Sequence, residues 1–192
     1  MNDRNDETQF EDFYRQECQA LYRYVYARVG NADDALEVAQ ESFLNLYRMQ
    51  SGKEAPVYER ALLFRMARNA AVDLLRRRRT REGYAREAVT SNLVPLRPAQ
   101  ERTPEELLLE KEQRQCAAAA FEGLGSRDQE CLVLRRSGLS YRAVAETMNI
   151  NPNSVSQAIN RALRRFEQAY NALVREQGAD EKSGKTRASK TH

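Results

Sequence analysis

Residues 140–165 read SYRAVAETMNINPNSVSQAINRALRR. The stretch predicts two short helices, at 140–148 and 152–165, because a tight connection around Asn149 separates two segments with apolar residues at helical spacing. Asparagine is one of the few residues that tolerates the left-handed backbone of such a connection. Small Ala145 lets the two helices approach closely where they cross. The pattern therefore predicts a helix-turn-helix.

The second of these helices presents a polar and basic face. Gln and Asn side chains can pair bidentately with adenine, Arg with guanine or phosphate, and Ser with phosphate. A simple helical hairpin whose polar face is only solvated would look similar, but the basic end of the helix favours DNA. The residues predicted to bind DNA here, called the reading set below, are Ser154, Ser156, Gln157, Asn160, Arg161 and Arg164.

Three longer amphipathic helices are predicted upstream, over about 9–29, 31–49 and 56–79, because apolar residues recur there at helical spacing. The side chain of Asn31 can cap the second of them. These helices predict a three-helix bundle in a first domain at 1–82. The second helix is expected to bury, with near neighbours as substitutes, Leu36, Val38, Phe43 and Leu46.

Residues 83–103 interrupt the periodicity with Gly, Ser and two prolines, and a helix does not propagate past each proline. This segment is predicted to be a flexible linker. Helical signals return over 104–122 and 126–138, so a second domain is expected at 104–176, with the helix-turn-helix at its end. Residues 177–192 are polar and are expected to form a disordered tail. The expected fold is all-α, with two small helical domains joined by the linker.

Arginines crowd the end of the third predicted helix, at 76–79 and 81. Cations at a helix C-terminus offset the helix dipole, but five of them exceed that need and favour phosphate neutralisation. Tyr58 and Phe64 lie nearby and can stack on unpaired bases, although a core position suits Phe64 better. The residues expected to contact nucleic acid here, called the arginine set below, are Arg65, Arg68, Asn69, Arg76, Arg77 and Arg78.

The second predicted helix carries an acidic face that nucleic acid would repel. It is either a solvated surface or a docking face for a basic protein partner, and the residues alone leave both open. The candidate contacts, called the acidic set below, are Asp34, Glu37, Gln40 and Glu41.

Several classes of protein are disfavoured by composition. The cysteines, Cys18, Cys116 and Cys131, lie far apart and suit small core positions, and the only histidine is His192. A metal site or a His-dependent triad has almost nothing to be built from. No apolar run approaches a membrane span and no signal peptide is seen, so we expect a cytoplasmic protein without membrane insertion. We expect no catalytic residue, no metal and no cofactor.

Three segments resemble segments of the extracytoplasmic-function (ECF) branch of bacterial sigma factors, and the resemblance spans about residues 9–170. The first is DALEVAQESF at 34–43, the second is LFRMARNAAVDLLRR at 63–77, and the third runs from GLSY at 138–141 to Arg165. Their order, with a linker between the second and third, makes the match far more specific than any one segment alone.

The resemblance implies a role for each set. It implies that the acidic set docks on the clamp helices of core RNA polymerase. The arginine set would melt and read the promoter −10 element, with Asn69 in a base-reading position, and the reading set would contact the −35 element. It also implies a bacterial cytoplasmic protein and an anti-sigma protein that covers the polymerase-facing surfaces. Leu62 stands where the family has a Trp, and Gln157 where it has a Ser, so strand opening and −35 preference are expected to be unusual.

Two other classes of protein fit parts of the sequence. A free-standing helix-turn-helix regulator would bind duplex DNA without polymerase, as a dimer on two-fold half-sites. A helical interaction adaptor would use its arginine run only to balance an acidic partner. An enzyme fits least, because no nucleophile–base pair, metal set or phosphate-binding glycine loop is visible.

Overall fold

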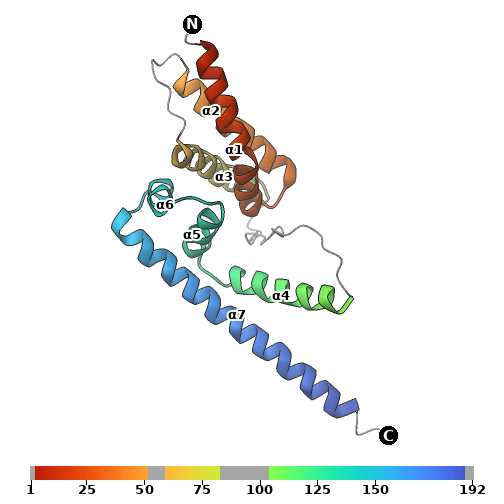
Figure 1. Ribbon diagram of the computed structural model, residues 1–192. Helices are drawn as coiled ribbons and strands as arrows, with labels where there is room; N and C mark the ends of the chain where they lie inside the picture. Colours follow the sequence, from red (N-terminus) through yellow and green to blue (C-terminus); the bar gives the residue numbers. More distant parts are fainter. Residues whose placement is uncertain (1–2, 52–58, 83–103, 189–192) are drawn as a thin grey trace.

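The computed structural model describes residues 3–51, 59–82 and 104–188, and these form seven helices with no strand (Figure 1). The predicted all-α class is therefore confirmed. The predicted linker at 83–103 lies outside the described residues. The helices are α1 (Asp3–Val29), α2 (Ala32–Gln50), α3 (Arg60–Glu82), α4 (Pro104–Glu122), α5 (Ser126–Arg136), α6 (Tyr141–Met148) and α7 (Pro152–Ala188).

Helices α1, α2 and α3 pack on one another as the predicted three-helix unit. Asn31 caps α2 as expected, because its side-chain oxygen accepts hydrogen bonds from the backbone N–H groups of Asp33, at 2.9 Å, and Asp34, at 3.1 Å. The carboxylates of these two residues also lie at the positive end of the α2 dipole. The chain reversal between α1 and α2 is thus set by local side-chain chemistry.

One predicted core residue of α2 is wrong. Leu36 is 50% exposed, whereas Ala35 beside it is fully buried. The buried residues of α2 recur at intervals of three and four along one stripe, and Leu36 lies about 100° around the helix from Ala35. The remaining expected residues are buried within that stripe, which comprises Ala35, Val38, Ala39, Ser42, Phe43 and Leu46.

The helix-turn-helix is formed by α6 and α7. Ser140 caps α6 by accepting a hydrogen bond from the Ala143 backbone N–H at 3.1 Å. Asn149 ends α6 with φ 53°, in the left-handed region, and α7 begins at Pro152. The side chain of Asn151 accepts from the Asn153 backbone N–H at 2.9 Å and so caps α7. These features confirm the predicted turn.

Three predicted helix limits are wrong. Helix α1 begins at Asp3, earlier than the predicted start, and α3 begins at Arg60, later than the predicted start at 56. Helix α7 continues to Ala188 and leads away from the body (Figure 1), so 177–188 is helical where a disordered tail was predicted. The prediction of the tail rested on its polar composition and its lack of apolar periodicity, whereas the Glu, Lys, Arg, Gln and Ala residues there have good helix propensity.

Helix α7 is also tied to α5 by charge. Arg165 Nη1 donates to Asp128 Oδ2 at 2.6 Å, and the Asp128 side chain is only 6% exposed. A carboxylate so far from water is costly without a cation, so this bond helps to fix the rotation of α7 about its axis.

The two helical units pack directly against each other, with α3 on α6 and α1 on α5 (Figure 1). Their apolar residues form one core cluster, in which Leu63 and Phe64 of α3 join Val144 of α6. Thr147 Oγ1 donates to the Ala61 backbone carbonyl across the junction at 3.3 Å. The sequence did not predict this packing. No helix in the described part of the chain combines the length and apolar character needed to cross a bilayer.

The turn before α7 yields a stability prediction. Asn149→Ala should lower the free energy of unfolding by about 1 kcal/mol, because alanine bears the steric cost of the left-handed region. Asn149→Gly should stay close to the parent chain, since glycine adopts positive φ without that cost. Urea denaturation followed by circular dichroism measures both, and equal stability of the two variants would contradict the left-handed turn.

Candidate nucleic-acid interface

The reading set lies on α7 opposite the side that packs into the helix-turn-helix. Val155, Ile159 and Ala162 are buried and anchor the helix. Ser154, at the start of α7, also donates from its hydroxyl to the Asn151 carbonyl at 3.0 Å. The whole reading set is exposed except Ser156, which is half-buried. The helix therefore presents one polar and basic surface to solvent.

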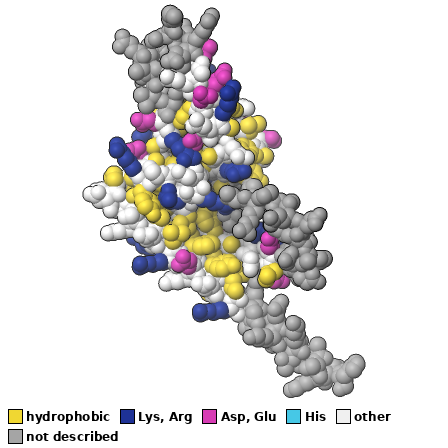
Figure 2. Space-filling view, viewed as in Figure 1, with side chains coloured by type: hydrophobic (Ala, Val, Ile, Leu, Met, Phe, Trp, Pro, Cys, Tyr) yellow, Lys and Arg dark blue, Asp and Glu magenta, His cyan; other side chains and the backbone are white. Residues whose placement is uncertain are grey.

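The arginine set lies on α3 and is divided between free and engaged side chains. Arg65, Asn69 and Arg76 are exposed and share one face of the helix, because separations of four and seven residues return to the same side. Arg77 is also exposed. Figure 2 shows that basic side chains are spread over the visible face among acidic and apolar ones. The structure thus leaves four of the six residues accessible.

Arg68 is engaged by the other helical unit. Its Nε and Nη2 donate to the two carboxylate oxygens of Glu130 on α5, at 2.7 and 3.2 Å, in a bidentate pair. The hydrogen bonds that Arg68 donates to Glu130 raise the pKa of its guanidinium above its ordinary value. In this arrangement Arg68 is held at the junction between the units.

Arg78 is engaged within its own unit and joins two predicted sets. Its Nη2 donates to Asp34 Oδ2 at the start of α2, and both side chains are partly buried. Asp34 therefore has a structural partner, whereas Glu37, Gln40 and Glu41 of the acidic set are exposed on α2. Because these residues recur at intervals of three or four, they form one continuous acidic face.

Of the two aromatic residues considered for base stacking, only Phe64 is among the described residues. Phe64 is fully buried and contacts the ring of Tyr24, with 5.3 Å between centroids, which confirms the core interpretation. Tyr58 lies outside the described residues.

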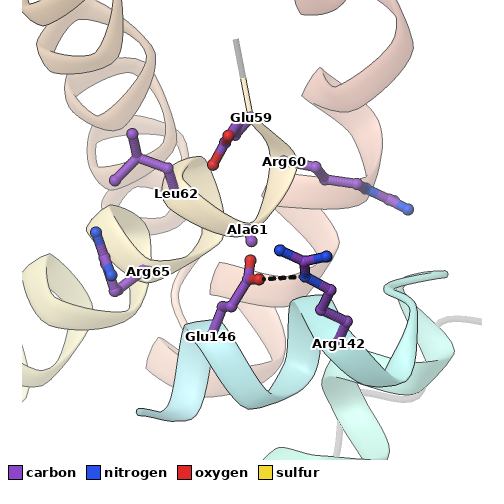
Figure 3. A pocket seen from close by; sticks show the side chains of 7 residues that line it. All are labelled: Glu59, Arg60, Ala61, Leu62, Arg65, Arg142 and Glu146. Atoms are coloured by element: carbon purple, nitrogen blue, oxygen red, sulfur yellow. Dashed lines mark hydrogen bonds and ion pairs between the residues drawn. The ribbon is translucent and has the colours of Figure 1, made fainter. Parts of the chain in front are cut away.

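Leu62, the residue in the place of the family's Trp, lies at the junction of the units. It lines a cavity of about 440 Å³ between the start of α3 and α6 (Figure 3). On the α6 side of this cavity, Arg142 Nε donates to Glu146 Oε1 at 2.8 Å, one turn along the same helix (Figure 3). Among the described residues no cluster of His, Cys, Asp and Glu has the geometry to hold a metal ion. The lining offers charges of both signs.

Comparison with known families assigns both units. A model of sigma-70 region 2 matches residues 13–81, and a model of sigma-70 region 4 matches residues 114–166. The two matches together cover more than half of the sequence. The chain belongs to the sigma-70 family. The acidic and arginine sets fall within region 2, and the reading set falls within region 4.

Curated relatives confirm the predicted ECF branch. The ECF RNA polymerase sigma factor BldN of Streptomyces coelicolor is 30% identical over 162 residues, 81% of this chain and 58% of the relative. The ECF RNA polymerase sigma factor SigE of Mycolicibacterium smegmatis is 26% identical over 153 residues, 79% of this chain and 58% of the relative. The match therefore spans less than two thirds of the length of each of these relatives.

A solved structure shows the same fold. The structure of CnrH in complex with the cytosolic domain of CnrY superposes with a TM-score of 0.58 at 19% sequence identity. The match covers 86% of this chain and 90% of the CnrH chain.

Sequence reasoning missed the buried acidic residues of the region 4 unit. Asp128 and Glu130 lie on α5 among the residues that face the core, and each is paired with arginine. The signal available in the sequence was two carboxylates in a segment that otherwise packs into the core. Their partners could not be read from it, because Arg68 lies 62 residues away from Glu130 along the chain.

The ion pair between Asp34 on α2 and Arg78 on α3 predicts that these two residues contribute to stability. Asp34→Asn and Arg78→Gln, made singly and together, should show a coupling free energy of about 1 kcal/mol, as expected for a partly exposed pair. Glu37→Gln, exposed on the same face of α2, should change stability by less than about 0.5 kcal/mol. Chemical denaturation measures all four variants, and additivity of the Asp34 and Arg78 effects would show that the pair contributes nothing.

Proposed function

We propose that this protein is a promoter-specific transcription initiation factor of the ECF type. On this proposal it binds core RNA polymerase and contacts the −10 and −35 elements of a promoter. The observation that carries the proposal is the presence of sigma-70 regions 2 and 4, in that order, each with an exposed polar or charged set on a rigid helix.

The reading set is proposed to enter the major groove of the −35 element. Gln157, Asn160 and Arg161 project from a helix whose opposite side is fixed in the core, so their positions are well defined. Side chains of these types can form bidentate hydrogen bonds to base edges. The rigid anchoring of α7 by Asp128 and Arg165 supports such a role, because base reading depends on precise helix orientation.

The arginine set is proposed to hold the opened −10 element. Arg65, Asn69 and Arg76 share a face on which a single strand can lie, and Arg76 and Arg77 can neutralise phosphates. Strand opening needs no covalent chemistry, since binding energy to unpaired bases can drive it. We accordingly propose that the protein is not an enzyme, requires no cofactor and acts in the bacterial cytoplasm.

The acidic set is proposed to bind the clamp helices of core polymerase. Glu37, Gln40 and Glu41 form an exposed acidic face, which favours a basic protein partner. An anti-sigma protein is expected to cover such a surface. The solved complex of CnrH with the cytosolic domain of CnrY supports this expectation, since a protein of the same fold is held by a second protein there.

Transcription in vitro tests the proposal. The purified chain, mixed with core polymerase and a linear promoter, should produce transcripts from one defined start. Gln157→Ala should reduce promoter binding by roughly 5- to 150-fold, the loss of about 1–3 kcal/mol for one bidentate base contact. Gln168→Ala, exposed on the same helix beyond the region 4 match, is the control and should leave output unchanged. Tight duplex binding without polymerase association would instead indicate a free-standing regulator.

Salt dependence tests the phosphate contacts separately. Arg76→Ala and Arg77→Ala should each reduce the slope of log K against log salt by about 1, because each removes one phosphate contact. Arg15→Ala, exposed on α1, should leave the slope unchanged. Filter binding of the polymerase–promoter complex at several salt concentrations gives the slopes, and an unaltered slope in the α3 variants would remove these arginines from the interface.

A further inference from the structure

Glu130 is a buried carboxylate whose partners all come from the other helical unit. Its side chain on α5 is only 6% exposed. Arg28 Nη1 donates to Glu130 Oε1 at 3.1 Å and Tyr24 Oη donates to the same oxygen at 3.3 Å, while Arg68 binds both oxygens. Arg28 and Tyr24 lie on α1, and Arg68 lies on α3. The carboxylate is therefore satisfied only while the region 2 and region 4 units stay together.

Hydrogen bonds from Arg60, at the start of α3, also join the two units at this junction. Arg60 donates to the backbone carbonyls of Ser137, at 2.5 Å, and Gly138, at 2.8 Å, and its Nε donates to Glu17 at 2.7 Å. Gly138 has φ +85°, and a Cβ there would approach the Arg60 guanidinium to 3.2 Å. The turn between α5 and α6 is thus shaped to receive an arginine from region 2.

The junction contains several charged side chains, and one of their buried donors lacks a hydrogen-bond partner in the described part of the chain. Among the described residues, Arg28 Nε is the buried side-chain atom without a hydrogen-bond partner. Water can solvate Glu130, Arg28 and Arg68 when the units separate, so the ion pairs are exchanged for hydration at modest net cost. The ionic part of the junction therefore favours reversible separation, whereas the apolar residues shared by the two units favour packing.

The junction also engages Arg68, which is one of the residues proposed to contact nucleic acid. Arg68 uses two donors of its guanidinium for Glu130, whose negative charge cancels most of its attraction for phosphate. The Arg68 side chain is 28% exposed, whereas Arg65 and Asn69 beside it are exposed. A single strand of DNA that lay along α3 would therefore have to displace Glu130 in order to bind Arg68.

We propose that the face of α5 and α6 around Glu130 is an intramolecular interaction surface for the basic face of α1 and α3, and that single-stranded DNA competes with Glu130 for Arg68. The competition rests on the proposed function, whereas the interaction surface does not. Occupation of this surface by the chain's own region 2 keeps the two DNA-contacting sets in one fixed arrangement. Binding of a strand to α3 releases the region 4 unit.

Removal of one buried charge tests the interaction surface. Glu130→Gln keeps the size of the side chain but leaves Arg28 and Arg68 without a counter-charge, so it should open the junction. Glu122→Gln is the matched control, because it removes one negative charge from the same unit at an exposed position on α4. Small-angle scattering should show a larger radius of gyration for Glu130→Gln alone, and hydrogen exchange should show loss of protection in α5 and α6 where they face α1 and α3.

Binding of a short fluorescent single-stranded oligonucleotide of mixed sequence tests the competition. By anisotropy, Glu130→Gln should bind about tenfold more tightly than the parent chain, a difference of about 1.4 kcal/mol. Glu122→Gln should bind like the parent. In the parent chain, saturating oligonucleotide should increase amide exchange at the junction, and this measurement decides the matter if Glu130→Gln does not fold.

Two results would overturn the proposal. Equal compactness of Glu130→Gln and the parent would refute the interaction surface, and equal oligonucleotide affinity, including binding by neither, would refute the competition. Start-specific transcription with core polymerase reports the sigma function independently. A chain that transcribes normally but shows no opening would therefore refute the inference alone.

Discussion

A carboxylate that is buried must be met by positive charge or by several hydrogen bonds, and Glu130 is met by both from a different helical unit. This requirement places α5 beside α1 and α3, and Leu63 and Phe64 share one core cluster with the region 4 helices at the same junction. Burial beside this carboxylate also raises the pKa of the Tyr24 hydroxyl, which therefore stays protonated and remains a donor. The arrangement of the whole molecule depends on this charge.

Buried ion pairs specify geometry more than they add stability, because their desolvation cost offsets most of the Coulombic gain. The protein uses this property twice, with different partners. Asp128 binds Arg165 and sets the orientation of α7 within one unit, whereas Glu130 binds arginines across the junction and sets the orientation between units. Two carboxylates two residues apart on α5 thus control two levels of structure.

Local chemistry made much of the fold predictable. The caps at Asn31 and Ser140 and the left-handed Asn149 act through neighbours in sequence, so the chain itself shows them. The exposed reading set was also predictable, because an amphipathic helix with a buried stripe leaves its other side to solvent. The engagement of Arg68 was not, since its partner is supplied by packing between segments that lie far apart in sequence.

The junction divides α3 into two functionally different halves. Its first turns carry Arg60, Leu62 and Arg68, which line the cavity beside α6 or bind the region 4 unit. Its last turns carry Arg76 and Arg77, which are exposed. On the proposed competition, a strand first meets the exposed arginines, where long-range attraction to phosphate is strongest, and reaches Arg68 only by displacing Glu130. On the same proposal, electrostatic displacement at Arg68 would contribute more to strand binding than stacking in this half of the helix, because Leu62 has no aromatic ring to stack on a base.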